Sequence, residues 1–301
     1  MTKVFIHGSH GTTGLRLKER LCGRSDISLI TLDEALRRDD DAIGCAITAA
    51  DIVFLCLPDD AAREAAALCE ARGKRVIDCS TAHRVNPDWV YGMPELGAAQ
   101  REAIISASRV SVPGCYACGF IALAKPLVAA SILSADSQIA FHALSGYSGA
   151  GKACIAEYES ATRNTELDSP RHYSLSLSHK HLPEMALYSG LAKEPIFTPI
   201  ICDYPQGMVV ALPLFADISL DIYRSFYASQ PLINICDGNR SDFLSSNMLA
   251  GRDDMEILVS GGQGKAVALA RFDNLGKGAS GAAIQCMNLM IGEEETKGLI
   301  L

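Results

Sequence analysis

Short apolar runs alternate with amphipathic helical patterns over the first 110 residues. The segment from Asp51 to Leu57 is almost entirely apolar and ends at Pro58, which is typical of a parallel strand buried on both faces. Similar patterns predict strands at Lys3–His7, Ile27–Leu32 and Lys74–Cys79, and helices at Thr13–Leu21 and Asp60–Arg72. Strands that alternate with helices predict a doubly wound parallel sheet, the Rossmann-type α/β architecture.

The pattern changes after Cys115. A helix is predicted at Phe120–Ala130, and more widely spaced β-like runs follow it at Gln138–Ser145, Ser174–Ser178, Phe197–Cys202, Met208–Phe215, Ile257–Ser260 and Ala266–Phe272. This spacing predicts an α+β second domain with a mostly antiparallel or mixed sheet. The last helical pattern is at Gly281–Ile291, where the apolar residues gather on one side.

Composition narrows the class of protein. Of the 301 residues 49% are hydrophobic, and the formal net charge is −8 without the Lys and Arg clusters that nucleic-acid binding needs. No apolar stretch is long enough to span a bilayer, and the first residues lead into a strand without a signal-peptide pattern. We therefore interpret the eleven scattered cysteines as reduced thiols and expect a cytoplasmic protein.

A glycine-rich segment, Gly8-Ser9-His10-Gly11-Thr12-Thr13-Gly14, lies between the first strand and the first helix. Its GxxGxxG spacing is a variant of the dinucleotide fingerprint, in which glycines let the backbone approach a pyrophosphate at a helix N-terminus. Because a strand precedes it and a helix follows it, the segment predicts a dinucleotide-binding site.

Asp33 ends the second predicted strand, where an acidic residue that binds ribose would favour NAD. We prefer the alternative that Asp33 caps the short helix predicted at Glu34–Arg38. Arg37 or Arg38 is then a candidate to bind the 2′-phosphate of NADP.

The segment from Val112 to Gly119 contains the candidate nucleophile. A Pro-Gly turn directly precedes Cys115 and a helical pattern follows it, so Cys115 is expected at a helix N-terminus. There the helix dipole and free N–H groups stabilise a thiolate, and they can also hold an oxyanion. The alternatives are a buried structural thiol, a Cys115-x-x-Cys118 redox pair, or a zinc site that adds His179 and His181. We interpret Cys118 as a core residue one helical turn further on.

The segment His179-Lys180-His181-Leu182-Pro183-Glu184 is the second concentration of reactive side chains. If it is extended, both histidines point to the same face. One of them can then transfer protons near pH 7 while Glu184 fixes its tautomer. The alternative is a polar surface loop.

Seven motifs in series make the chain similar to the short form of the N-acetyl-γ-glutamyl-phosphate reductases of arginine biosynthesis, nearly from end to end. They are Gly8–Gly14, Asp78–Arg84, Tyr91–Leu96, Pro113–Tyr116, Ser145–Lys152, His179–Glu184 and Asp273–Gly281. The resemblance implies that NADPH reduces N-acetyl-L-glutamyl 5-phosphate to the 5-semialdehyde, with release of phosphate and without a metal. A thioester on Cys115 suits this reaction, because nucleophilic catalysis divides it into two easier steps.

The resemblance also implies an organisation in domains. Residues 1–113 with 277–301 would form the dinucleotide-binding domain, and residues 114–276 a catalytic and dimerisation domain like that of glyceraldehyde-phosphate dehydrogenase. Dimers or tetramers are expected. The implied acid/base lies within His179–His181, and we favour His181.

Further site residues are expected from the same motifs. Arg84 and Lys152 are candidate cationic partners of an acidic substrate, with Ser148 and the backbone at Gly149 as neutral donors. The expected cofactor-binding residues are Gly8, His10, Gly11, Thr12, Thr13, Gly14, Ser80, Gly278 and Gly281.

The chain departs from the family beside the nucleophile. Val112 stands where Asn is common, and Ala117-Cys118 stands where Pro-Thr or Ala-Thr is usual. The alternative functions are another acyl-phosphate reductase, such as an aspartate-semialdehyde dehydrogenase, and a nucleotide-sensing protein without turnover.

Overall fold

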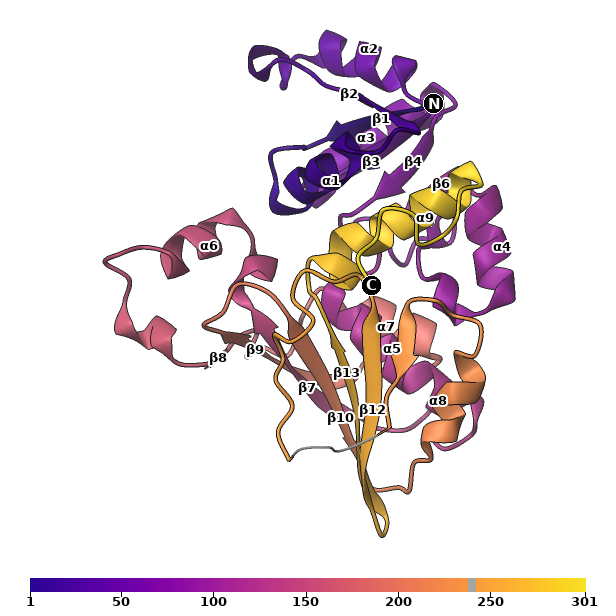
Figure 1. Ribbon diagram of the computed structural model, residues 1–301, viewed down its shortest axis with the longest axis vertical. Coiled ribbons are helices and arrows are strands. Elements are labelled where there is room, and N and C mark those ends of the chain that lie inside the picture. The colour runs from indigo at the N-terminus through magenta and orange to yellow at the C-terminus, as the bar shows by residue number, and fades with distance from the viewer. Residues whose placement is uncertain (238–241) are drawn as a thin grey trace. The chain divides into compact units, whose positions relative to one another are not determined.

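The computed structural model describes residues 1–237 and 242–301, which form two compact units (Figure 1). One unit contains Met1–Pro113 and Ala279–Leu299, and the other contains Gly114–Gly278 and Ile300–Leu301. The chain therefore passes from the first unit to the second just before Cys115, and it returns just after Gly278.

The first unit contains a parallel sheet with the strand order β2-β1-β3-β4-β6-β5. Its strands are β1 (Thr2–His7), β2 (Ile27–Ile30), β3 (Ile52–Leu55), β4 (Arg75–Asp78), β5 (Val90–Tyr91) and β6 (Arg109–Ser111). Every residue of β3 is buried, as its continuous apolar run predicts.

Helices cover both faces of this sheet. Their bounds are α1 (Thr12–Cys22), α2 (Asp40–Ala49), α3 (Asp59–Ala71), α4 (Ala98–Ser106) and α9 (Gly281–Ile291), with short 3-10 helices η1 (Glu34–Leu36) and η2 (Pro94–Leu96). Residues of α1, α4 and α9 share one hydrophobic cluster with the sheet, and residues of α2 and α3 form another cluster on the opposite face. The C-terminal helix α9 thus completes the core of the first unit.

The second unit contains a mixed sheet with the order β11-β12-β13-β10-β7-β9-β8. Its strands are β7 (Ala140–Gly146), β8 (Arg171–His172), β9 (Ile196–Cys202), β10 (Met208–Leu214), β11 (Ile233–Ile235), β12 (Met255–Gly262) and β13 (Lys265–Phe272). The pairs β7–β9 and β11–β12 are parallel, and the other neighbouring strands are antiparallel.

Helix α5 (Cys115–Ala129) packs against this sheet and is almost completely buried. A Cβ on Gly119 would lie 2.6 Å from a methyl group of Val210, so the helix approaches β10 closely. Helices α7 (Leu182–Ser189) and α8 (Leu220–Phe226) contact α5, and the hydroxyl of Tyr223 in α8 donates to the carbonyl oxygen of Leu123 in α5 (2.9 Å).

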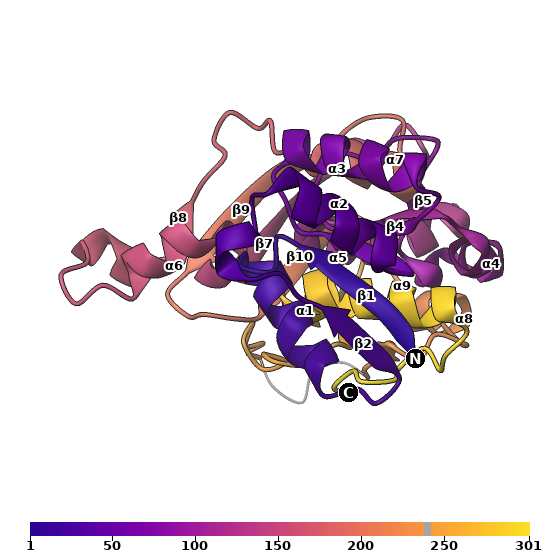
Figure 2. The ribbon, with the colours of Figure 1, turned by 90° about the horizontal axis from the view of Figure 1, so that it is seen from above.

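A separate arm leaves the sheet after β7. It contains η3 (Tyr147–Ala150), α6 (Lys152–Tyr158) and η4 (Thr165–Asp168), and it projects from the sheet of this unit in both ribbon views (Figures 1 and 2). Tyr147 and Tyr158 stack at 4.7 Å between ring centroids and, with Leu167, give the arm a small apolar core of its own.

Most predicted elements are confirmed, and three expectations are wrong. The helix expected from Phe120 begins at Cys115, and the helix expected at Glu34–Arg38 is only the short η1. Ser174–Ser178 does not form a strand; the strand β8 lies just before it, at Arg171–His172. The α/β class with a mixed-sheet second domain is confirmed.

Candidate active site

The glycine-rich segment forms a tight turn between β1 and α1. Gly8 has φ of +87°, and a Cβ there would lie 2.3 Å from the carbonyl oxygen of Cys56, so a side chain does not fit. Gly11 is the N-cap of α1, and a Cβ on Gly14 would lie 2.3 Å from the carbonyl oxygen of Gly8. Helix α1 begins with Thr12 and Thr13, whose backbone N–H groups lie at the helix N-terminus that stabilises anions.

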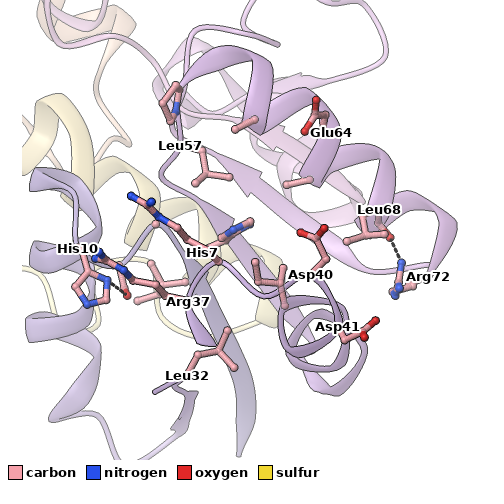
Figure 3. A pocket seen from close by; sticks show the side chains of 18 residues that line it. His7, His10, Leu32, Arg37, Asp40, Asp41, Leu57, Glu64, Leu68 and Arg72 are labelled. Atoms are coloured by element: carbon pink, nitrogen blue, oxygen red, sulfur yellow. Dashed lines mark hydrogen bonds between the residues drawn. The ribbon is translucent and has the colours of Figure 1, made fainter. Parts of the chain in front are cut away.

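A pocket of about 860 Å³ lies beside this turn (Figure 3). Its walls come from the end of β1, from the segment after β2 with the first turn of α2, and from one face of α3. Gly8 and His10 line it, and so do Arg37 and Arg38. The pocket therefore joins a glycine turn that suits phosphate groups to two cationic side chains.

Asp33 stands at the N-cap of η1, as the preferred interpretation predicted, but its side chain makes no capping hydrogen bond. The helix that is capped by an aspartate is α2, where Asp39 accepts from the backbone N–H of Ala42 (2.8 Å).

Ser80 belongs to a buried hydrogen-bonded turn after β4. The carboxylate of Asp78 accepts from the backbone N–H (2.9 Å) and the hydroxyl (2.7 Å) of Ser80. His83 Nδ1 lies 2.7 Å from the same carboxylate, and the His83 ring stacks on Trp89 with 4.0 Å between centroids. This network gives the loop from Asp78 to Arg84 a fixed shape.

Arg84 is buried in the first unit. Its Nε donates to the carbonyl oxygen of Val112 (2.9 Å), and one Nη donates to that of Cys79 (3.4 Å). Val112 is itself part of the hydrophobic core, and its N–H donates to the carbonyl oxygen of Asp78 (2.7 Å). An apolar side chain therefore suits position 112 in this chain.

Cys115 is the first residue of helix α5, and Gly114 is the N-cap. The thiol thus stands at the N-terminus of a 15-residue helix, where the dipole favours a thiolate. Gly278 packs against it, because a Cβ on Gly278 would lie 2.8 Å from the Cβ of Cys115. Cys118 is buried one turn further on, with its Sγ 3.9 Å from the carbonyl oxygen of Lys277, which agrees with a core position.

The two histidines lie together in a turn before α7. The segment is not extended, since the N–H of Leu182 donates to the carbonyl oxygen of His179. The ring centroids of His179 and His181 are 4.6 Å apart. His179 Nδ1 accepts from the backbone N–H of His181 (3.1 Å), so the neutral His179 ring carries its proton on Nε2. His181 is buried and stands at the N-cap of α7.

Glu184 links this segment to the nucleophile. It is buried in the first turn of α7, and its Oε2 accepts from the backbone N–H of Gly114 (3.2 Å). The sequence suggested that Glu184 orients a histidine. The hydrogen bond to Gly114 adds a second role, because it fixes the residue that precedes Cys115.

Two tyrosines that sequence reasoning missed complete the cluster. The Tyr116 ring lies 5.6 Å from His179 and 6.0 Å from His181, and Tyr173 lies 6.0 Å from His179. Burial, reinforced by the charge of a Cys115 thiolate, raises the pKa of both phenols. Both hydroxyls therefore stay protonated near neutral pH. In the sequence, only the position of Tyr116 directly after Cys115 indicated that a tyrosine belongs to this cluster.

Ser148 is held on η3 by an asparagine from a distant segment. Asn274 Nδ2 donates to the hydroxyl of Ser148 (3.1 Å), and Asn274 Oδ1 accepts from the N–H of Gly207 (2.9 Å). Gly149 is exposed, and a Cβ on it would lie 3.1 Å from that Nδ2. Lys152 is exposed at the start of α6.

Gly281 begins α9 and is buried in the first unit, whereas Gly278 belongs to the second. Within residues 1–237 and 242–301, no group of three or more His, Cys, Asp or Glu side chains is arranged to hold a metal ion. No helix in the same ranges is long and apolar enough to cross a bilayer.

Comparison with known proteins places the chain in a family. The models for the NAD binding domain and the dimerisation domain of semialdehyde dehydrogenase match residues 3–106 and 115–274. The solved aspartate semialdehyde dehydrogenase II of Vibrio cholerae superposes with a TM-score of 0.74 at 16% identity, over 97% of this chain and 98% of that one. A probable aspartate-semialdehyde dehydrogenase of Pseudomonas aeruginosa gives 0.73 at 18% identity, over 96% and 98%. These two structures share the fold.

The curated relatives are more similar in sequence. The N-acetyl-γ-glutamyl-phosphate reductases of Brucella anthropi and Brucella ovis are each 45% identical to this chain, over 97% of its length and 99% of theirs. The chain therefore belongs to the semialdehyde dehydrogenase family and, within it, to the N-acetyl-γ-glutamyl-phosphate reductases.

Proposed function

We propose that the protein reduces N-acetyl-L-glutamyl 5-phosphate to N-acetyl-L-glutamate 5-semialdehyde, with NADPH as the reductant and phosphate as the leaving group. The observation that carries the proposal is a thiol at the N-terminus of α5 whose neighbour in the sequence, Tyr116, has its ring beside those of two histidines. The 45% identity to reductases named for this substrate supports the choice of acyl group.

The first chemical step is attack of the Cys115 thiolate on the acyl carbonyl. The C–O bond to phosphate breaks, phosphate leaves, and a thioester remains on Cys115. The N-terminal N–H groups of α5 are suited to stabilise the oxyanion of the tetrahedral intermediate. Glu184 supports this step, because its bond to the N–H of Gly114 holds the turn before the nucleophile.

When bound, the nicotinamide supplies a hydride to the thioester carbon. His181 donates the proton that the resulting thiohemiacetal oxygen requires, and it recovers one as this intermediate collapses to the aldehyde and thiolate. His179 is assigned a positioning role, because its Nδ1 is engaged by the N–H of His181. Burial and the N-cap position of His181 support this choice between the two histidines.

The pocket beside Gly8 fits the adenosine half of the cofactor. The glycine turn and the start of α1 suit the pyrophosphate, and the cationic pair Arg37 and Arg38 suits a 2′-phosphate, which favours NADP over NAD. Ser80, Gly278 and Gly281 are assigned to cofactor binding through the family motifs alone.

For the substrate we assign Arg84 and Lys152 to its acidic groups, and Ser148 with the backbone of Gly149 to its neutral ones. Asn274 holds Ser148 in place, so we add Asn274 as a positioning residue. The match to a dimerisation domain over residues 115–274 supports a homo-oligomer, a dimer or a tetramer. We expect the protein in the cytoplasm, where its thiols stay reduced.

The deciding experiment is a steady-state assay in the oxidative direction. Purified protein is given N-acetylglutamate semialdehyde and phosphate with NADP or NAD, and aspartate semialdehyde replaces the substrate in a parallel series. We expect turnover with the acetylated substrate and a higher kcat/KM with NADP. If only aspartate semialdehyde is turned over, the substrate must be reassigned. If neither semialdehyde is turned over, the result favours a nucleotide-sensing protein. Light scattering on the same preparation gives the oligomeric state.

A further inference from the structure

His7 is the last residue of β1, and its side chain lies on the face of the sheet that α2 and α3 cover. Side chains alternate along β1: Val4 and Ile6 belong to the cluster with α1, and Phe5 belongs to the cluster with α2 and α3. The His7 ring continues this second face and stacks on Phe5, with 5.9 Å between centroids. An imidazole thus stands where the apolar face of the sheet reaches the pocket.

One ring nitrogen of His7, which lines the pocket, is unpartnered in the part of the chain that the structure describes. His7 lines the pocket, and Figure 3 shows it near the middle, with His10 and Arg37 on one side and Asp40 on the other. Its Nδ1 is buried and has no hydrogen-bond partner among the residues that the structure describes. A buried nitrogen of this kind costs free energy unless a ligand satisfies it.

Charges of both signs surround the imidazole from the neighbouring elements. The cations are Arg37 and Arg38 after β2 and Arg72 after α3, the acids are Asp40 and Asp41 of α2 and Glu64 of α3, and His10 lies in the glycine turn. Arg72 donates to Thr48 Oγ1 and to the carbonyl oxygen of Leu68, so it is held between two helices. The side chain of Arg37 is 41% exposed, and its nearest carboxylate oxygen is that of Glu34 at 3.6 Å. Arg37 is therefore better placed than Arg72 to receive an anion.

We propose that His7 takes up a proton when the 2′-phosphate of the cofactor binds beside Arg37, so that the imidazolium becomes part of the phosphate site. The proposal rests on the NADP preference proposed above and adds a residue that distinguishes the two cofactors. The proton comes from solvent, and no covalent bond changes. The alternative is that His7 stays neutral and that the same nitrogen contacts the adenine of the cofactor.

The direction of the effect follows from electrostatics. Burial lowers the pKa of His7 in the free protein, so the ring is neutral near pH 7. A phosphate dianion at hydrogen-bond distance favours the charged form and raises that pKa. Binding therefore consumes a proton at pH values between the free and the bound pKa, and affinity falls as pH rises through that interval.

The test is calorimetric titration of the full-length protein with 2′,5′-ADP and with 5′-AMP between pH 6 and pH 8.5. Buffers of different ionisation enthalpy give the number of protons exchanged. Wild type is compared with His7→Gln, which keeps a neutral hydrogen-bonding group. The matched control is His142→Gln, because burial also lowers the pKa of His142, on β7 of the other unit.

We expect wild type to bind 2′,5′-ADP about tenfold more tightly than His7→Gln near pH 6.5, and equally near pH 8.5. The number of protons taken up on binding should be smaller in His7→Gln, by the amount that the His7 ring takes up in wild type. His142→Gln should take up as many protons as wild type. The affinity for 5′-AMP should not change in either variant.

Three outcomes would overturn the proposal. Equal proton exchange in wild type and His7→Gln would show that His7 does not titrate on binding. Equal losses for 2′,5′-ADP and 5′-AMP would assign His7 to adenine. If wild type binds 2′,5′-ADP and 5′-AMP equally tightly, the pocket has no site for the 2′-phosphate, and the proposed NADP preference is wrong. The turnover assay would still decide which reaction the protein catalyses.

Discussion

The cofactor pocket and the nucleophile cluster are built in different ways. The pocket of the first unit comes from a continuous stretch of about 70 residues, and its main determinants are a glycine turn and the ends of adjacent strands. The cluster around Cys115 comes from segments far apart in the chain, namely α5, the turn before α7, and the η5 segment (Gly276–Ser280). Binding therefore depends on local backbone shape, and chemistry depends on tertiary packing.

Removal of the nucleophile should separate the two regions most sharply. Cys115→Ala should lower kcat on the order of 10⁴-fold or more, because no thioester can form, yet leave NADPH affinity unchanged. Cys118→Ala is the matched control and should keep activity, since Cys118 is a core residue. Steady-state kinetics and calorimetry measure the two quantities. Comparable losses in both variants would instead favour a dithiol centre.

The next largest loss of kcat is expected from substitution of the histidines, and it should differ between His181 and His179. His181→Gln should lower kcat by about 10²- to 10⁴-fold, the usual contribution of a general acid/base. His179→Gln should cost less, since that ring makes a hydrogen bond to the backbone and is assigned a positioning role. The pH profile of kcat should lose a limb only in His181→Gln. The reverse ranking would exchange the two roles.

A change at Gly8 should damage binding and spare the nucleophile. In Gly8→Ala the new Cβ would overlap the carbonyl oxygen of Cys56, and such overpacking costs about 1–3 kcal/mol of folding stability. Because the turn must shift to relieve the overlap, NADPH affinity should fall as well. The rate of Cys115 alkylation should not change. Gly73→Ala is the control, because Gly73 also has positive φ (+61°) but a Cβ there would meet nothing within 4 Å. Equal losses in both variants would mean that backbone strain alone is responsible.

A smaller effect is expected where the C-terminal segment joins the first unit. Arg24 donates to Asp26, to Asn288 and to the carbonyl oxygen of Lys297. Arg24→Met should lower the free energy of unfolding by about 1.5–3 kcal/mol, because Arg24 is nearly buried and its bonds are charge-assisted. Arg109→Met breaks a more exposed pair with Glu70 and should cost about 1 kcal/mol or less.

The Arg24 effect should depend on pH. Arg24 and Lys297 hold the pKa of Asp26 well below its usual range, so the stabilisation is present above the unfolded pKa of about 3.9 and is lost as pH falls further. The stability difference between Arg24→Met and wild type should therefore narrow below about pH 4 in urea titrations. If the difference in the free energy of unfolding stays constant with pH, the stabilisation comes from packing of the aliphatic part of Arg24 and not from its charge.

The elements that the sequence predicted correctly lie in both units. Hydrophobic periodicity located β1, β3, α1 and α3, because each follows from a continuous local pattern. The elements that were not predicted are mostly short, and they are the helices α2, α4, α6, α7 and α8 and the strands β5, β6, β8 and β11. Cys115 and His181 were proposed from their motifs, and they stay predictions. Tyr173 and Asn274 were not assigned to the site, because nothing local indicates that packing brings them to it.

The bond from Glu184 to the N–H of Gly114 also bears on how such enzymes can change in evolution. Helices α5 and α7 pack together, Cys115 begins α5, and His181, the proposed acid/base, is the N-cap of α7. The Glu184 carboxylate joins the two helices at these ends. The candidate substrate groups on the arm after β7 belong to a different part of the unit, with its own small core. Mutations in the arm can therefore alter which acyl group is accepted while the reactive pair is inherited intact, so the chemistry and the specificity are separable targets for selection and for engineering.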